Sequence, residues 1–257
     1  MIRGAYVAVM GMRAHMARQE IVARNLANLL TVGYKQEGVA TDGFSDAIGR
    51  ADRLVQQASV LPAASTAPIG SLGTEVVVDR PYVDLRQGRL DETGRPLDVA
   101  LQGDGFLRVR TPDGEFFSRG GPLHLDADGR LVTDEGYAVQ GAGGDLVLGS
   151  GAITIQPDGA ILVNGQTAGR LSVVEFAPGT WLEKVRDGLY SPVDPAVVPT
   201  EATNTTVKQG FLEASNVDEV AALSEMMWLL RAYQAGQRMF QVQDEAVGKA
   251  VNELGRV

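Results

Sequence analysis

Two histidines and a short run of aspartates are the residues that come nearest to a chemical site. His15 and His124 stand far apart in the sequence, and no third ligand lies at metal-binding spacing from either. Asp126-Ala-Asp128-Gly129 begins like a calcium loop, but the later ligand positions and the closing glutamate are absent. We interpret these residues as surface, packing and turn residues, and predict no metal site.

Other catalytic and cofactor-binding patterns are also missing from the sequence. Gly103-Asp-Gly105 lacks the third glycine of a dinucleotide fingerprint and precedes a strand-like stretch, so it offers no helix N-terminus to a phosphate. There is no phosphate-binding loop and no nucleophile-elbow motif. The 32 acidic residues leave a glycosidase-like carboxylate pair open, although no spacing singles one out. We predict no catalytic residues, no cofactor and no small-molecule substrate.

Composition limits the class of protein further. With 257 residues, 44% of them hydrophobic, the chain can hold one large domain or two modest ones. A net charge of −9 argues against a nucleic-acid partner, which would require a basic face. The absence of cysteine excludes disulfides, thiolate metal sites and cysteine nucleophiles, and it suits an oxidising compartment and the cytosol alike.

The N-terminus does not resemble a secretory signal. Its apolar positions are interrupted by Arg13, His15, Arg18 and Glu20. No run reaches the roughly 18 apolar residues that a membrane helix needs. If the chain leaves the cytoplasm, we expect a route that uses no cleaved signal peptide.

The C-terminal stretch from Val207 to Val257 predicts the element around which the chain is organised. It contains no proline, and its apolar residues alternate at spacings of three and four. Gln237 and Asp244 fill the two gaps in this heptad seam. A repeat of this kind predicts a long helix, beginning near Asn216, that packs against another helix. The seam residues are Met226, Leu230, Tyr233, Phe240, Val247, Val251 and Leu254.

The first thirty residues carry a second seam of the same period, interrupted only by Gln19. Two such seams favour a coiled-coil-like pair of terminal helices, and ordinary amphipathic packing on a globular core is the alternative. The polar seam positions either fix the register of the helices or face solvent. The N-terminal seam residues are Ile2, Ala5, Val9, Met12, Met16, Ala23, Leu26 and Leu30.

Between the helices the pattern changes twice. Gly33 predicts the end of the first helix, and the composition of residues 38–73 predicts a linker, with a short helix at 42–57. From about Thr74 to Thr200 apolar residues alternate with period two, and glycine-rich turns such as Asn164-Gly165 separate short strands. We therefore predict an α+β fold with a central, mainly antiparallel β domain. The expected boundaries are 1–32 for the first helix, 33–73 for the extended linker, 74–200 for the β domain and 207–257 for the second helix.

Three blocks of sequence follow one another along the chain: Ala23-Arg-Asn25-Leu26-Ala27-Asn28, Arg95-Pro96-Leu97-Asp98-Val-Ala-Leu-Gln-Gly103-Asp-Gly105-Phe106, and Gln209-Gly210-Phe-Leu-Glu-Ala-Ser215-Asn216-Val217. Two shorter motifs accompany them, Gly33-Tyr34-Lys35 after the first block and Leu230-Arg-Ala-Tyr-Gln234 in the second helix. In the right order and covering essentially the whole chain, these motifs resemble those of the rod, hook and hook-associated proteins of the bacterial flagellum. Leu30 and Val32 depart from the family pattern, which often has Asn and Pro there.

The resemblance implies a structural function and no enzyme. It implies an axial subunit of the flagellar basal-body rod that assembles helically, transmits torque for motility and lines the export channel. Partners would be copies of the chain, other rod and hook axial proteins, the type III export apparatus and the surrounding ring proteins. The location would be the cell-wall-spanning rod, where the polar seam residues would set register or face the channel.

Within that family, chain length and a single β domain favour a rod protein over a hook protein. The short linker and Ala100-Leu-Gln102 favour the proximal-rod type over the distal-rod type. A distal-rod or hook-type axial protein is the alternative, and a peptidoglycan-associated hydrolase or binding domain is an alternative from another class.

Overall fold

The structure is a computed structural model that describes residues 2–41, 78–186 and 188–254. The helix expected at 42–57 lies outside the described residues. The chain divides into two compact units. We call residues 1–24, 38–81 and 220–257 the helical unit, and residues 25–37 and 82–219 the β unit.

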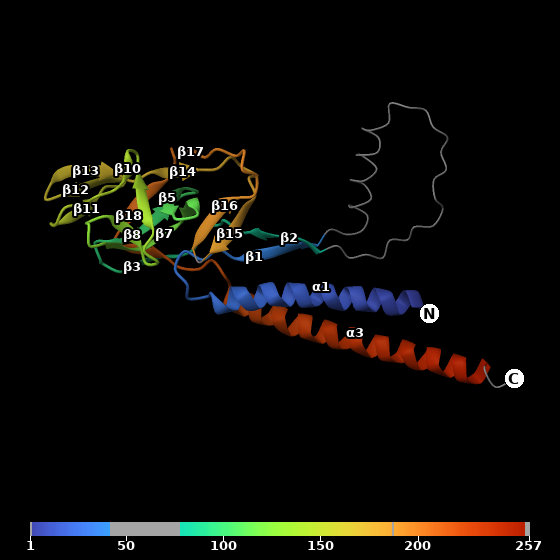
Figure 1. Ribbon diagram of the computed structural model, residues 1–257. Coiled ribbons are helices and arrows are strands. Elements are labelled where there is room, and N and C mark those ends of the chain that lie inside the picture. Colours follow the sequence, from blue (N-terminus) through green and yellow to red (C-terminus); the bar gives the residue numbers. More distant parts are fainter. Residues whose placement is uncertain (1, 42–77, 187, 255–257) are drawn as a thin grey trace, which may run out of the picture. The chain divides into compact units, whose positions relative to one another are not determined.

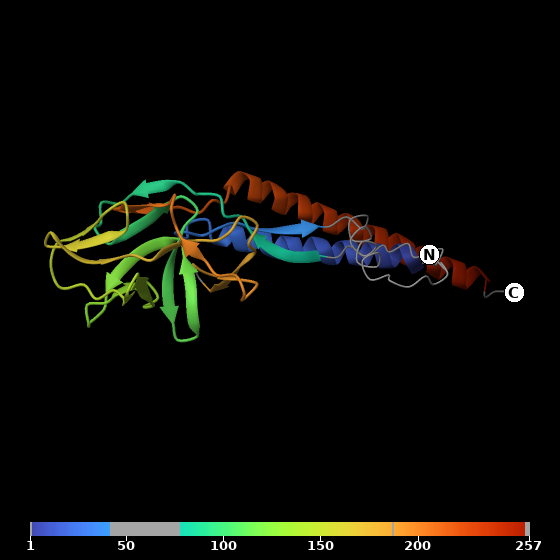
Figure 2. The ribbon, with the colours of Figure 1, turned by 90° about the horizontal axis from the view of Figure 1, so that it is seen from above.

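The helical unit contains most of two long helices, α1 (Ile2–Ala27) and α3 (Glu219–Leu254). They run side by side in both views (Figures 1 and 2). In the part of the chain that the structure describes, neither helix is long and apolar enough to cross a membrane. Glu219 in the first turn of α3 suits the positive end of the helix dipole.

The β unit is built around one antiparallel sheet of 12 described strands, in the order β15-β16-β6-β5-β9-β8-β7-β4-β18, with β10, β14 and β17 attached to it (Figure 1). These strands are β4 (Asp98–Gln102), β5 (Phe106–Thr111), β6 (Gly114–Ser118), β7 (Gly120–Leu125), β8 (Leu131–Thr133), β9 (Ala138–Gly141), β10 (Gly144–Asp145), β14 (Val173–Glu175), β15 (Leu182–Arg186), β16 (Leu189–Pro192), β17 (Thr200–Glu201) and β18 (Thr206–Gln209).

Three smaller described sheets complete the strands. The first pairs β1 (Glu37–Thr41) with β2 (Val78–Val83), and the second pairs β3 (Leu90–Glu92) with β19 (Phe211–Glu213). The third contains β11 (Ile153–Ile155), β12 (Ala160–Val163) and β13 (Gln166–Arg170). Asn164 and Gly165, with φ of 53° and 82°, form the tight turn between β12 and β13 that the sequence predicted.

Among the described residues of the β unit, two apolar clusters form much of the core. The larger one is aliphatic and brings together strands from both ends of the unit, because Leu101 in β4 and Val207 in β18 are paired and both are buried. The smaller one is aromatic: Phe106 lies edge-on to Tyr190, with ring centroids 5.8 Å apart. Edge-to-face packing adds to the apolar burial of such rings.

The predicted α+β class is confirmed, with two terminal helices and a large antiparallel β domain. The boundary expected at 207 differs from the structure, in which Val207 belongs to β18 and α3 begins only at Glu219. Val207–Gln209 extend because they pair with β4, a long-range contact that a local helical pattern does not reveal. At the other end α1 stops at Ala27, and Gly33 adopts φ of 68°.

Candidate functional site

Helices α1 and α3 contact each other through mixed polar and apolar side chains. Arg18 Nε lies 2.6 Å from Glu225 Oε1, and the His15 and Trp228 rings meet edge-on with centroids 5.6 Å apart. A Cβ on Gly236 would lie 2.7 Å from Met12 Cγ, which shows how closely the helices approach there. These contacts join residues 12–18 of α1 to residues 225–236 of α3.

The buried side of α3 coincides with the predicted heptad seam at three of its described apolar positions. Met226, Tyr233 and Val247 are partly buried, as a seam requires. Between them, however, Leu229 is fully buried, whereas Leu230 is 41% exposed. Phe240 and Val251 are also exposed, and the side chain of Leu254 lies outside the described residues. The part of these residues in self-assembly stays a prediction.

The N-terminal seam shows the same one-residue offset. Met12 is partly buried against α3, whereas Met16 is 47% exposed and its neighbour His15 contacts Trp228. Leu26 and Val9 are partly buried, Ala23 is exposed, and Leu30 is 92% exposed; the side chains of Ile2 and Ala5 lie outside the description. Several predicted seam residues are thus left uncovered on a single chain.

The polar seam positions are now placed as well. Gln237 and Asp244 are exposed, and Gln19 is partly buried. The residues that precede Gln237 and Asp244 in the sequence are Gly236 and Gln243, and both are partly buried. Within one chain, therefore, Gln237 and Asp244 lie at the surface of α3.

In the β unit the family-motif residues converge on one polar network. Asn25 donates from Nδ2 to the Glu37 carbonyl (2.7 Å), and its Oδ1 accepts from the Glu37 N–H (2.9 Å) and from the Tyr34 hydroxyl (3.1 Å). Leu26, Ala27 and Asn28 continue the chain into the turn that ends at Gly33. Asn25 is thus the residue that fixes how the chain turns back after α1.

Three buried charges form the centre of this network. Lys35 Nζ lies 2.6 Å from Glu213 Oε1 and donates to the Arg86 carbonyl at 2.8 Å, with Lys35 1% and Glu213 2% exposed. Arg119 Nε lies 3.6 Å from the other carboxylate oxygen of Glu213. The Glu213 carboxylate also accepts from the Gly88 N–H at 2.7 Å. One buried carboxylate therefore serves two buried cations and a main-chain donor.

Arg119 connects this centre to the glycine motif of the β unit. Its guanidinium donates to the Gly105 and Gly103 carbonyls at 2.6 and 2.7 Å and lies 5.1 Å from the centre of the Phe106 ring. A Cβ on Gly105 would lie 2.7 Å from the Thr205 side chain, so no larger residue fits there. The Gly-Asp-Gly-Phe motif is thus a close-packing site and not a phosphate-binding loop.

The segment that precedes α3 is hydrogen-bonded to residues of the same polar network. Asn216 accepts from the Gln36 N–H at 2.7 Å and donates to the carbonyls of Asp84 and Arg86 at 2.9 and 3.0 Å. Ser215 Oγ accepts from the N–H of Val217, which is buried. These residues hold the segment before α3 against the turn that follows α1.

The remaining motif residues form a neighbouring part of the network. Asp98, which is buried, accepts from the Thr93 hydroxyl at 2.6 Å and from Arg95 Nε at 2.8 Å. Its carbonyl accepts from the N–H of Gly210, a residue with φ of 78°. The Pro96 carbonyl accepts from Gln209, and Leu97 packs against the aliphatic core.

Lys35, Arg119 and Glu213 are functional candidates that their positions in the sequence did not reveal. Lys35 and Glu213 lie inside recognised motif blocks, so their position in those blocks was the available signal. Their pairing, however, joins residues 178 positions apart, which no local pattern encodes. Arg119 had no signal beyond being a charged residue in a strand-rich region.

The two histidines and the aspartate run singled out in the sequence lie in ordinary surface contacts, and the described residues contain no group of three or more potential metal ligands. His124 Nε2 lies 3.1 Å from Asp134 Oδ1 at the surface. Asp126 Oδ1 accepts from the N–H groups of Asp128 and Arg130, which is the geometry of a turn. These aspartates therefore stabilise the loop before β8.

Burial raises the pKa of the Tyr190 hydroxyl above its usual value of 10.0. Because the unfolded state then releases this proton first, the contribution of Tyr190 to stability is present below about pH 10 and is lost as the pH rises further. Lys35 acts in the opposite direction: burial lowers its pKa, so its contribution rises with pH until both states are neutral above 10.5. The effect of Tyr190 is therefore clearest above 10.5.

Tyr190→Phe is expected to reduce the loss of stability in that alkaline range. At about pH 8 the free energy of unfolding of the variant should be about 1 kcal/mol lower than that of the wild type, because the variant lacks the hydrogen bond from the Tyr190 hydroxyl to the Gly33 carbonyl at 3.3 Å. Urea unfolding of both proteins between about pH 8 and pH 11.5 measures the two effects. An equally steep fall in both proteins above 10.5 would contradict the assignment to Tyr190.

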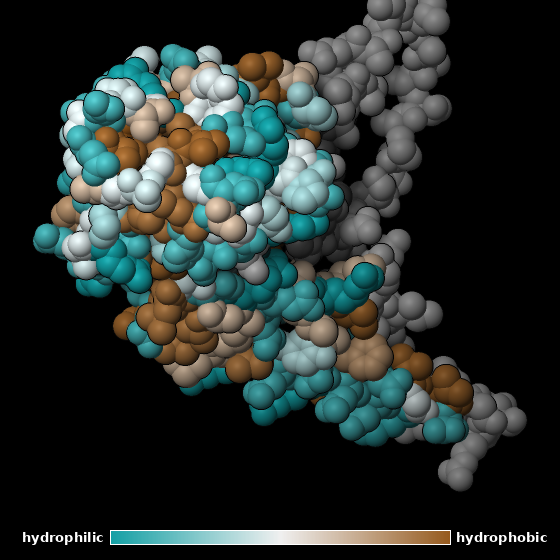
Figure 3. All heavy atoms as spheres, turned by 60° about the vertical axis from the view of Figure 1, so that its left-hand side comes forward, coloured by the Kyte–Doolittle hydropathy of each residue, from teal (hydrophilic) through white to brown (hydrophobic). Residues whose placement is uncertain are grey.

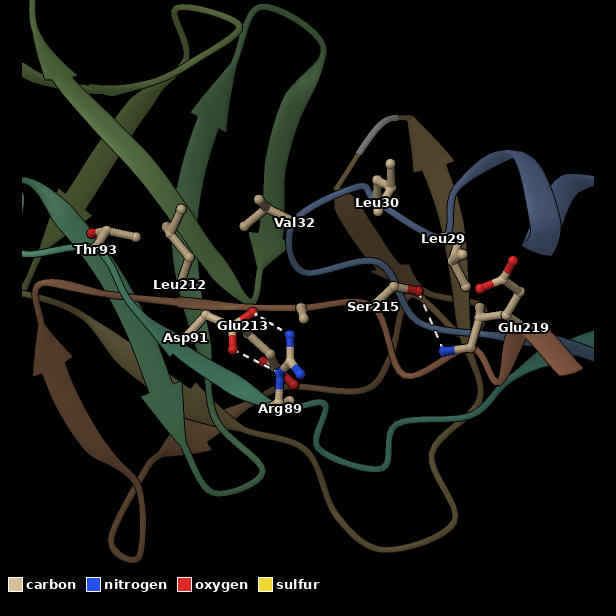
Figure 4. Close-up of a pocket in the computed structure, with 12 residues that line it drawn as sticks. Leu29, Leu30, Val32, Arg89, Asp91, Thr93, Leu212, Glu213, Ser215 and Glu219 are labelled. Atoms are coloured by element: carbon tan, nitrogen blue, oxygen red, sulfur yellow. Dashed lines mark hydrogen bonds and ion pairs between the residues drawn. The ribbon is translucent and has the colours of Figure 1, made fainter.

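A groove of about 570 Å³ lies beside the network, within the β unit. Figure 4 shows Leu29, Leu30 and Val32, from the loop after α1, on one side, and Leu212 of β19 on the other. An ion pair between Arg89 and Asp91, at 2.7 Å, borders the groove. This surface is mainly apolar, and it is open to solvent.

Two paired terminal helices, together with a β unit whose motif residues act in packing and chain positioning, define a structural protein. Comparisons with known proteins agree. Three family models match: "Flagella basal body rod protein" at residues 6–35, "Flagellar hook protein FlgE/F/G D1 domain" at 100–173 and "Flagellar basal body rod FlgEFG protein C-terminal" at 208–253.

Similar proteins match along almost the whole chain. The chain is 31% identical to the flagellar basal-body rod protein FlgG of Agrobacterium fabrum, over 95% of this chain and 96% of that protein. It is 32% identical to the rod protein FlgF of Escherichia coli over 97% and 96%, and 29% identical to FlgG of Bacillus subtilis over 98% and 99%. This chain belongs to the family of flagellar basal-body rod proteins, which are structural proteins and not enzymes.

Proposed function

We propose that this chain is an axial subunit of the flagellar basal-body rod that assembles helically with copies of itself and with other rod and hook axial proteins. The observation that carries the proposal is the surface of α3. Leu223, Met227 and Leu230 are exposed on one side of the helix, and Trp228, Met239 and Val242 on another. Figure 3 shows apolar side chains at the surface of the helices among hydrophilic ones.

A helix that exposes apolar residues on several of its faces is expected where several neighbouring helices or subunits cover those faces. In a helical assembly, each copy covers faces that a single chain leaves open. In this proposal α1 and α3 pair as a coiled-coil-like domain, and the predicted seam residues that remain exposed contact neighbouring subunits. The terminal helices line the export channel, and motor torque passes along them toward the hook.

We also propose where in the rod the subunit lies and by which route it is exported. We assign it to the proximal rod, on the short linker and on Ala100–Gln102. The chain reaches the cell-wall-spanning rod through the flagellar type III export apparatus without a cleaved signal peptide, and ring proteins surround the assembled rod. Similar rod proteins carry both the FlgF and the FlgG names, so the position needs a direct test.

Basal bodies isolated from cells that produce an epitope-tagged copy provide this test. We expect the label in the rod, at the end nearer the cytoplasm. Mass spectrometry of the same subunit should recover the peptide that begins at Met1 or Ile2. Label confined to the outer end of the rod or to the hook would contradict the proximal assignment, and absence from basal bodies would contradict the proposed function.

A further inference from the structure

The tight turn between β12 and β13 contains the one asparagine of the sequence that is followed by glycine, Asn164-Gly165. An asparagine side chain loses its amide group most easily before glycine, because glycine has no side chain to hinder the attack of its own main-chain nitrogen. Asn164 is also, among the described residues, the only non-glycine residue with a positive φ, 53°. A chemically reactive pair therefore lies at an exposed hairpin tip in a constrained conformation.

The fold engages the Asn164 side chain in the small sheet of β11, β12 and β13 (Figure 1). The main-chain N–H of Asn164 donates to the Ala152 carbonyl at 2.9 Å, and its side-chain Oδ1 accepts from the Ala152 N–H at 3.0 Å. In a regular antiparallel pair a main-chain carbonyl would accept this second bond. The side chain of Asn164 thus takes the place of a main-chain acceptor and extends the pairing of β11 with β12 by one residue.

Close packing against Gly151 holds the same side chain. A Cβ added to Gly151 would lie 2.6 Å from Asn164 Oδ1, so a larger residue would displace the side chain from Ala152. By contrast, a Cβ on Gly149, in the same loop before β11, would meet no atom beyond its chain neighbours within 4 Å. The two glycines therefore distinguish the contact with Asn164 from the general effect of an added methyl group in this loop.

We propose that Asn164 is a site of non-enzymatic deamidation in the unfolded chain and that the folded hairpin prevents this reaction. The Gly165 nitrogen attacks Asn164 Cγ, a bond forms between these two atoms, and the bond from Cγ to Nδ2 breaks. The side-chain nitrogen leaves as ammonia with the proton of the Gly165 nitrogen, and water then opens the cyclic imide to aspartate or iso-aspartate. In the folded chain Oδ1 must first leave Ala152 and the turn must open, so the reaction requires local unfolding. Deamidation at this position therefore records the time that a chain spends unfolded.

Peptide mapping by mass spectrometry tests this inference on the full-length chain. Folded samples in buffer and unfolded samples in guanidinium chloride would be kept at the same pH and temperature, and the conversion of amide to acid would be followed at each asparagine. Asn204 is the internal control, because it is also exposed but is followed by threonine. We expect Asn164 to react at least about tenfold faster in the unfolded chain than in the folded one, since only locally opened molecules react in the folded state.

Two alanine variants test how the fold prevents the reaction. Gly151→Ala should raise the rate at Asn164 in the folded chain by about three- to tenfold, the effect of losing one hydrogen bond, and should leave the rate in the unfolded chain unchanged. Gly149→Ala should change neither rate. Equal rates at Asn164 in the folded and unfolded wild type would overturn the protection by the fold. A rate at Asn164 in the unfolded chain that is no higher than the rate at Asn204 would overturn the site itself.

Discussion

Replacing Glu213 with glutamine is expected to destabilise the β unit by about 3–5 kcal/mol, since it leaves buried cations without their anionic partner. Lys35 and Arg119 are both almost fully buried, and Glu213 is the carboxylate that faces them. Urea unfolding of the full chain, followed by tryptophan fluorescence, measures the loss. Trp181 lies in the β unit, and Trp228 is the other tryptophan of the chain. Replacing Trp228 with phenylalanine in both proteins makes the fluorescence signal come from Trp181 and therefore from the β unit.

Asp113→Asn is the matched control for this prediction. Asp113 also forms an ion pair, with Arg186 at 2.7 Å, but both side chains are more than half exposed. An exposed pair contributes about 0–1 kcal/mol, so the control should remain close to the wild-type stability. If Glu213→Gln lowers the free energy of unfolding by no more than this control does, the buried carboxylate is not the centre of the network.

The pH dependence of the Glu213 variant adds a second readout. Burial lowers the pKa of Lys35 from 10.5, and loss of the carboxylate removes an interaction that raises it. The variant should therefore recover part of its stability as the pH rises toward 10.5, because Lys35 then becomes neutral in the folded state at a smaller cost. A deficit that does not change with pH would point to lost packing instead.

Leu229→Asp and Leu230→Asp are expected to fail in different ways, although the residues are adjacent. Leu229 of α3 is fully buried, so an aspartate there should cost several kcal/mol and destabilise the helix. Leu230 is 41% exposed, so its replacement should leave the monomer folded while it abolishes incorporation into the rod and motility. The charge would be buried only when a neighbouring subunit covers it.

Circular dichroism and a swimming assay separate these two outcomes. Leu229→Asp should lose helical signal in the purified chain, and Leu230→Asp should retain it. Leu230→Met, which conserves volume and polarity, is the control that should restore motility. A motile Leu230→Asp strain would remove this position from the assembly surface.

The sequence predicted the parts of this fold that depend on short-range patterns. The Asn164–Gly165 turn is one example, because both residues readily adopt positive φ. The two long helices are another, although the buried residue is Leu229 and not the predicted seam residue Leu230 beside it. Both leucines fit an apolar pattern, and only the tertiary packing of α3 decides which one is buried.

What the sequence could not provide are contacts between distant residues. The boundary of the second helical segment was predicted at Val207, but Val207 and its neighbours form a strand because they pair with β4. Glu213 looked like one acidic residue among many until the fold placed Lys35 and Arg119 around it. The motif residues could be recognised, whereas the network they form depends on topology.

The hydrogen bonds that join the turn after α1 to the segment before α3 have a consequence for how related chains can vary. The Gly33 N–H donates to the Glu213 carbonyl at 2.7 Å, so the segment 25–37 of the β unit is joined to the end of its other segment, 82–219. The first entry of the chain into the β unit and its last exit are therefore held together, and these two points are the ends of the unit. Hairpin tips such as Asn164–Gly165 can be lengthened, or carry a grafted peptide, without altering the spacing between those ends. We therefore expect related chains to keep the joined ends of the β unit and to vary in the length and sequence of its hairpin tips.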